Sequence, residues 1–212
     1  MLLQGNQGQG TKQVGQNLVV GVGEFSELLA SELQPRYYEQ AYRGQTFYTS
    51  VAAGSLTAYT GGAGGTPLLG VWNPAGTGKN LVLLQAGVAI SAASSVAGNP
   101  AYRLYAGATA AITGTLTVPV STLTLNQSGS IAKVISNTAA TSSTALTYLL
   151  TLGTYYWATA ASANLAVPLT TDFSGSIIIP PGTMIAVGSS IATATMTSMA
   201  ADAWFIWSEV AI

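Results

Sequence analysis

SGSIIIPPGTMIAVGSSIATATMTSMAADAWFIWSEVAI, residues 174–212, contains the clearest strand patterns of the chain. The apolar run 177–179 is interrupted by Pro180, Pro181 and Gly182, because proline cannot donate to a strand ladder and glycine allows the reversal. Residues 183–187 return as a second strand. Residues 192–197 alternate strictly between Ala or Met and Thr, which predicts one apolar and one hydroxyl face. We expect three consecutive antiparallel strands.

The closing segment 204–212, WFIWSEVAI, predicts one more strand, and alternation divides its side chains into two faces. One face holds Trp204, Ile206, Val210 and Ile212, and the other holds Phe205, Trp207 and Glu209. We expect the first set to enter the core, because it is longer and only Ser208 interrupts it. Phe205 and Trp207 are then exposed and become candidates for self-association with a symmetry mate.

From Gly44 onward, short β-prone runs are separated by Gly, Pro, Asn and Ser, which is typical of an antiparallel sandwich or barrel. The expected strands before the C-terminal stretch are 45–51, 56–59, 67–72, 80–91, 101–105, 112–120, 130–136, 146–152 and 155–158. Within 80–91 one face carries Val82, Leu84, Ala86, Val88 and Ile90. This pattern predicts a central strand.

The composition excludes much chemistry. The chain has no cysteine and no histidine, so disulfides, thiolates, imidazole bases and the commonest zinc ligands are absent. We expect no enzyme, no metal site and no cofactor. Charged residues make up only 6% of the chain, and the formal net charge is −1, which makes nucleic acid an unfavourable partner. No run of about 20 residues is predominantly apolar, so no membrane span is expected.

The N-terminal segment differs from the rest. Of residues 1–17, eleven are Gln, Gly or Asn, which leaves little to bury. Residues 24–33, EFSELLASEL, predict a short helix that ends before Pro35. Its apolar stripe consists of Phe25, Leu28, Leu29 and Leu33. So short a helix is marginal in water and needs a surface to cover.

Seven of the thirteen charged residues lie at or before Arg43, so we expect a division between an arm, 1–43, and a sandwich domain, 44–212. Residues 36–43, RYYEQAYR, combine tyrosines and arginines in a way that is typical of contact surfaces. Arg36, Tyr37, Tyr38 and Arg43 are therefore contact candidates. A linker packed on its own domain explains the same segment equally well.

Other motifs have simpler structural interpretations. Asn73–Asn80, NPAGTGKN, departs from a phosphate-binding loop at both ends and predicts a turn. Asp172, Asp202 and Glu209 show no spacing that would pair two carboxylates across a cleft, and turn or edge-strand roles explain them better. Tyr155, Tyr156 and Trp157 could stack on a sugar, although aromatics in a strand are more often part of a core.

Three segments carry a resemblance to a known class of proteins. Residues 37–47, YYEQAYRGQTF, residues 73–84, NPAGTGKNLVLL, and residues 204–212, WFIWSEVAI, resemble small virion proteins of tailed bacteriophages that are encoded among head genes. The resemblance implies a capsid cement or decoration protein. It also implies a jelly-roll-like β-sandwich on the shell, with an N-terminal arm that binds the major capsid protein.

We therefore expect an all-β, antiparallel, jelly-roll-like sandwich with an extended N-terminal arm containing one short helix. The expected function is a structural virion protein, a dimer or trimer, made in the host cytoplasm and bound outside the capsid. A tail or receptor-binding module that recognises host glycans is the alternative. An enzyme is disfavoured because the inventory of acids, bases and nucleophiles is nearly empty.

Overall fold

The computed structural model of the chain describes residues 37–55, 59, 61–92, 98–113, 116–127, 129–136, 141–155, 168–190 and 200–212. The chain divides into two compact units, Met1–Glu39 and Gln40–Ile212, and the sandwich lies in the second. One short helix, α1 (Tyr38–Tyr42), precedes the first strand. The domain division that we expected after Arg43 stays a prediction.

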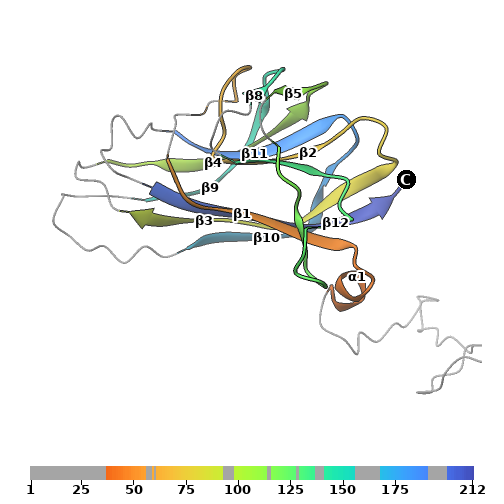
Figure 1. Cartoon of the computed structure of the whole chain (residues 1–212). Coiled ribbons are helices and arrows are strands. Elements are labelled where there is room, and N and C mark those ends of the chain that lie inside the picture. The colour runs from red at the N-terminus through yellow and green to blue at the C-terminus, as the bar shows by residue number, and fades with distance from the viewer. Residues whose placement is uncertain are drawn as a thin grey trace, which may run out of the picture. The chain divides into compact units, whose positions relative to one another are not determined.

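Two five-stranded antiparallel sheets face each other in the second unit (Figure 1). Sheet I has the order β10 (Leu169–Ile179), β3 (Lys79–Ala92), β12 (Ala200–Ala211), β1 (Thr46–Ser55) and β6 (Val120–Ser121). Sheet II has the order β7 (Lys133–Ser136), β2 (Leu69–Asn73), β11 (Thr183–Ser189), β4 (Ala101–Ala108) and β9 (Thr147–Thr154). A separate two-stranded ribbon joins β5 (Ile112–Thr113) to β8 (Thr141–Ser142).

The order of the strands is that of a jelly roll. Along the chain, β1, β3, β10 and β12 lie in sheet I, whereas β2, β4, β9 and β11 lie in sheet II. Their spatial orders, β10-β3-β12-β1 and β2-β11-β4-β9, are those of the eight-stranded double sheet with two Greek keys. β6 and β7 extend the two sheets beside β1 and β2. The expected all-β antiparallel sandwich is confirmed.

The core lies between the two sheets and is formed by alternate residues of each strand. Sheet II contributes Leu69, Val71, Leu104, Ile185 and Val187. Sheet I contributes Phe47, Leu81, Leu83, Val88, Phe205 and Trp207. Phe47 and Trp207 pack with ring centroids 6.3 Å apart. Because apolar burial is the dominant favourable term in folding, this double layer is the main source of stability.

The corner at residues 180–182 differs from our expectation. β10 and β11 are not paired with each other, because β10 pairs with β3 in sheet I and β11 pairs with β2 and β4 in sheet II. The Pro-Pro-Gly segment therefore carries the chain from one sheet to the other, with Gly182 at φ 78°. The expected strand 192–197 lies outside the described residues.

Asn73 joins the corner at residues 180–182 to the turn between β2 and β3 through side-chain hydrogen bonds. Its side chain is fully buried, and Nδ2 donates to the carbonyl oxygens of Lys79 at 2.8 Å and of Ile179 at 3.0 Å. Thr77 Oγ1 donates to Asn73 Oδ1 at 2.8 Å. The NPAGTGKN segment is thus a sheet-to-sheet turn, as its sequence indicates.

In β3 the expected apolar face is correct only in its second half. The pairing with β12 skips Leu84, since Ile206 lies opposite Gln85 and Trp207 lies opposite Leu83. This bulge reverses the alternation, so that Leu81 and Leu83 enter the core before it, and Ala86, Val88 and Ile90 enter after it. The strand is central, as predicted, with β10 and β12 on its two sides.

For β12 the predicted face is wrong. Phe205 is 0% and Trp207 is 1% exposed, and both lie in the core. Trp204 and Ile206 are half-buried, whereas Val210 and Ile212 are exposed. Phe205 and Trp207 therefore cannot form an exposed self-association surface on the folded sandwich.

Among the other expected elements, one strand is interrupted and several elements lie outside the described residues. The expected strand 112–120 is interrupted, and only Ile112–Thr113 and Val120–Ser121 pair as strands among the described residues. The expected helix 24–33, with Phe25, Leu28, Leu29 and Leu33, lies outside the described residues, as does Arg36. Most of 56–59 and of 155–158 lies outside them too.

Candidate interaction surface

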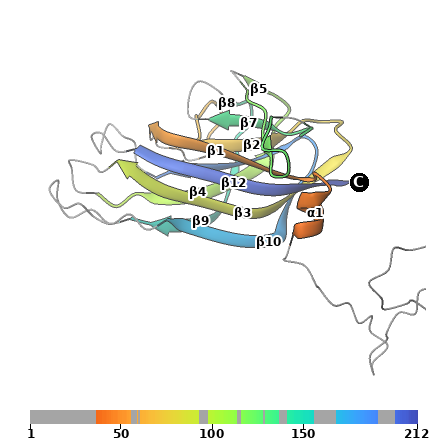
Figure 2. The same cartoon turned by 60° about the horizontal axis from the view of Figure 1, so that its bottom comes forward.

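The outer surface of sheet I is formed by the residues that alternate with its core residues. We call this surface the sheet I face, and Figure 2 shows its four long strands side by side. On the four long strands its apolar members are Tyr48, Val82, Ile178, Trp204 and Ile206. Ile178 is 57% exposed, and the other four are half-buried.

The strand register places these side chains in adjacent rows. In one row Val120 of β6 lies opposite Tyr48, Tyr48 opposite Ile206, and Ile206 opposite Gln85. The side chains of directly opposite residues in antiparallel strands are within contact distance. The row therefore forms a continuous strip that is apolar over its first three members.

Trp204 lies flat on the neighbouring strand. Its register partner is Gly87, and a Cβ added to that glycine would overlap the indole ring. The indole Nε1 donates to Gln85 Oε1 at 3.3 Å. Glycine at position 87 thus creates the space in which the tryptophan covers the sheet, and Gln85 fixes the direction of the ring.

Charge on this surface is confined to two carboxylates among the described residues of the strands. Asp172 lies on the edge strand β10, where Oδ1 accepts hydrogen bonds from Ser174 N at 2.8 Å and from Ser174 Oγ at 3.0 Å. Asp202 lies near the start of β12, opposite Ala89. Tyr48, Ile206 and Gln85, which lie between these two positions and β6, therefore form an uncharged part of the sheet I face.

The outer surface of sheet II is different because the chain's own loops cover it. A second apolar cluster contains Tyr59, Tyr105, Ile135, Leu146, Met184 and Ala186. Tyr59 is 1% exposed and meets the Tyr105 ring edge-on, with centroids 5.1 Å apart. On sheet I, Tyr48 and Trp204 stay partly accessible on the outer surface.

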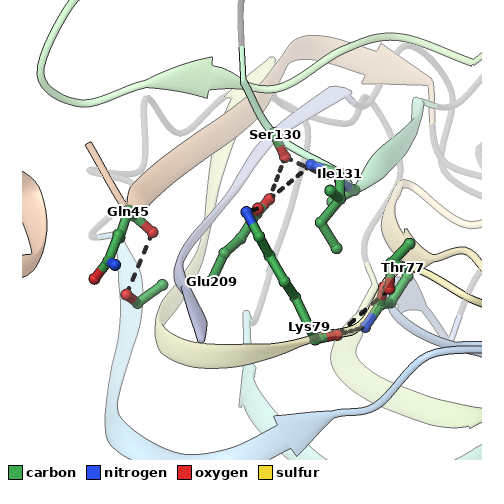
Figure 3. Close-up of polar contacts among 9 residues, drawn as sticks. Gln45, Thr77, Lys79, Ser130, Ile131 and Glu209 are labelled. Carbon is green, nitrogen blue, oxygen red and sulfur yellow. Dashed lines mark hydrogen bonds and ion pairs between the residues drawn. The ribbon is translucent and has the colours of Figure 1, made fainter. Parts of the chain in front are cut away.

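Glu209 is a buried carboxylate with three polar partners, and Figure 3 shows its contacts. The side chain is only 1% exposed. Oε1 accepts from Ser130 Oγ at 2.6 Å and from Ile131 N at 3.0 Å, while Lys79 Nζ lies 3.2 Å from Oε2. The carboxylate thus joins β12 and β3 of sheet I to the segment that leads into β7 of sheet II.

This arrangement is structural in character. All of these partners hold the carboxylate in place, and β12 is a central strand, so the edge or turn role expected for Glu209 is wrong. Asp172 has the turn-type hydrogen bonds that the sequence suggested. Within the described part of the chain, no three acidic, histidine or cysteine side chains come together in a way that could hold a metal ion.

Tyr155 packs inward. Its ring meets that of Tyr102 edge-on at 5.8 Å, and its hydroxyl donates to the carbonyl oxygen of Val88 at 3.4 Å. Burial raises the pKa of this phenol. Tyr155 is thus partly buried against the core, and Tyr156 and Trp157 lie outside the described residues.

The remaining contact candidates lie around α1. Tyr38 is 47% exposed, Arg43 is exposed, and Tyr37 is half-buried with φ 70°. Sequence reasoning missed the sheet I face, because each of the two alternating sets of β12 contains one acid, Asp202 or Glu209.

Comparisons with protein-family models, with curated proteins and with solved structures found no match to this chain. The described part of the chain contains no helix long and apolar enough to cross a membrane.

Proposed function

We propose that this protein is a structural component of a tailed-phage virion, which binds the outside of the capsid and cements or decorates it. The observation that carries the proposal is the jelly-roll order of the two sheets. This topology recurs in viral capsid and lectin domains. Because a fold does not by itself determine function, the proposal also rests on the resemblance of three segments to phage virion proteins and on the chemistry of the side chains.

The side-chain chemistry supports a binding role. The chain has neither histidine nor cysteine, and Glu209, its most buried described carboxylate, holds two sheets together. The proposed partner is the major capsid protein, and the proposed attachment device is the arm 1–43 with the stripe Phe25, Leu28, Leu29 and Leu33.

A glycan-binding tail module remains the second candidate, since lectin domains share the jelly-roll topology. The position of Tyr155 counts against it, because the ring packs edge-on against Tyr102 and is partly buried at the core. The two functions differ in where the protein is found on the particle.

A binding experiment separates them. The purified full chain is mixed with empty heads prepared from the phage that encodes it, and bound copies are counted after sedimentation of the heads. A cement protein binds in a fixed ratio to shell subunits. Binding to tails or to host cells, with none to heads, would contradict the proposal.

The arm can be tested in the same assay with a shortened protein that begins at Gly44. We expect it to remain soluble and rich in strand, because all the core residues that the structure describes lie after Gly44. Head binding should be lost. Full decoration by the shortened protein would exclude the arm as the attachment device.

Leu29→Asp tests the helical stripe within the full chain. A buried, unpaired carboxylate costs roughly 3–5 kcal/mol, so head binding should weaken while the melting temperature of the sandwich hardly changes. Leu123→Asp is a matched control, because Leu123 is 50% exposed on the sandwich and lies outside the arm. Equal loss of folding and binding in Leu29→Asp would place the helix in the domain core.

A further inference from the structure

We propose that the sheet I face is a two-fold self-association surface, on which a second copy of this chain packs sheet against sheet. The proposal concerns the purified protein and does not rest on the virion assignment. It replaces Phe205 and Trp207 as self-association residues with their outward neighbours, Trp204 and Ile206.

The apolar side chains of the sheet I face are partly exposed to solvent. Trp204, Ile206 and Tyr48 remain half-buried on one sheet surface whose described charges are Asp172 and Asp202, whereas sheet II covers part of its outer surface with Tyr59 and the cluster around it. Contiguous apolar surface of this kind marks an interaction site on a soluble protein. In a chain with only 6% charged residues, it is also poorly protected from association.

The area of the sheet I face is sufficient for a weak dimer interface. Four strands about 4.8 Å apart, each about eight residues long with a rise of about 3.3 Å, present roughly 500 Å² per copy. A face-to-face pair buries roughly 1,000 Å² in total, which is the lower limit for a specific interface. The expected dimer is therefore weak, with a Kd in the micromolar range.

The twist and the charge of the sheet I face also favour a second copy of the chain. Two copies of one sheet have the same twist, so they can stack in the aligned arrangement that packed sheets generally adopt. Tyr48, Ile206 and Gln85 are uncharged, Asp172 lies on the edge strand β10, and Asp202 lies near the start of β12, towards one end of the sheet. Packing two copies together therefore desolvates few charges, which favours a second copy over a partner chosen by charge.

Sedimentation equilibrium of the full chain, from about 1 to about 200 μM, measures the association directly and brackets a micromolar Kd. We expect a reversible monomer–dimer equilibrium. Ile206→Lys should weaken it by roughly 100-fold or more, because each dimer would bury two unpaired ammonium groups. Leu149→Lys is the matched control, since Leu149 is 43% exposed on β9 of sheet II, and it should leave the Kd unchanged.

Circular dichroism must show that Ile206→Lys is folded. If it is not, Tyr48→Lys, in the same cross-strand row, replaces it with the same expected result. The proposal is overturned if the wild type is monomeric throughout the concentration range. It is equally overturned if the dimer survives both lysine variants, or if Leu149→Lys dissociates it instead.

Discussion

Glu209 shows how one residue can hold together segments that are far apart in the sequence. Its partners Lys79 and Ser130 are 130 and 79 residues away. A buried carboxylate is tolerated only when hydrogen bonds and an opposite charge replace its hydration. Here one oxygen accepts two hydrogen bonds and the other contacts the lysine ammonium. We call this side chain, with its contacts to Lys79, Ser130 and Ile131, the Glu209 clamp, because it links the two sheets.

Glu209→Ala should lower the free energy of unfolding by about 2–4 kcal/mol, because Ser130 and Ile131 lose their acceptor and Lys79 loses its partner. Glu209→Gln keeps an acceptor oxygen and should cost about half as much. Lys79→Met should cost less than Glu209→Ala, since the lysine side chain is 39% exposed and both hydrogen bonds to the carboxylate remain. Urea unfolding gives the three values, and equal costs would contradict the Glu209 clamp.

Two glycines offer a comparison at the same scale. A Cβ at Gly87 meets the far end of the Trp204 ring, which lies at the surface and can rotate away. A Cβ at Gly188 lies 2.6 Å from Cβ of Tyr59, a side chain that is 1% exposed and cannot move freely.

Gly188→Ala should therefore destabilise the fold by about 1–3 kcal/mol, the usual cost of overpacking, and Gly87→Ala by less than about 1 kcal/mol. Gly87→Ala should nevertheless displace Trp204 and weaken the proposed dimer. Denaturant unfolding and sedimentation equilibrium measure the two effects separately. The reverse order of stabilities would show that Trp204 is held more firmly than its exposure suggests.

At the scale of elements, β12 organises the molecule because it is the middle strand of sheet I. It pairs with β1 on one side and with β3 on the other. Its inward residues Ala201, Ala203, Phe205 and Trp207 lie in the core, and its outward residues form the sheet I face. One strand thus supplies both the stability of the sandwich and its candidate interaction surface.

Substitutions on the two faces of β12 should lower the free energy of unfolding by different amounts. Phe205→Ala should cost about 3–5 kcal/mol, because it removes a fully buried ring and leaves a cavity. Ile206→Ser should cost less than about 1 kcal/mol, since the side chain is only half-buried. Thermal unfolding followed by circular dichroism distinguishes them. Unfolding by Ile206→Ser with tolerance of Phe205→Ala would restore the original face assignment.

At the scale of the whole molecule, two buried tyrosines link stability to alkaline pH. Tyr59 and Tyr102 are 1% and 0% exposed, and neither hydroxyl has a hydrogen-bond partner within the described structure. Burial raises the pKa of Tyr59 from 10.0 to about 12 and raises that of Tyr102 further. A folded-state pKa above the unfolded value means that the folded protein holds these protons more tightly.

Stability from Tyr59 is therefore fully present below pH 10.0 and is lost as the pH rises towards about 12. We expect the midpoint of urea unfolding to fall over this range, with buried tyrosines that ionise only on unfolding. Tyr59→Phe should remove its share of the pH dependence, which ultraviolet absorbance of tyrosinate can follow. A midpoint that does not change above pH 10 would contradict the prediction.

The sequence by itself determined the class of the fold and the position of most strands. Alternation and turn residues predict β3 at 80–91, and the observed strand is Lys79–Ala92. The same reasoning identifies residues 73–80 as a turn. These features are local, because side-chain period and turn chemistry act within a few residues.

Tertiary structure alone decided which face of β12 is buried. Each of its two alternating sets contains one acid, Asp202 in one and Glu209 in the other, so the pattern was ambiguous. Lys79, Ser130 and Ile131 arrive from distant segments and make Glu209 the acid that can be buried. The bulge at Leu84 could not be predicted from the sequence either. It is defined by the register between β3 and β12, and neither strand alone encodes how it pairs with a distant strand.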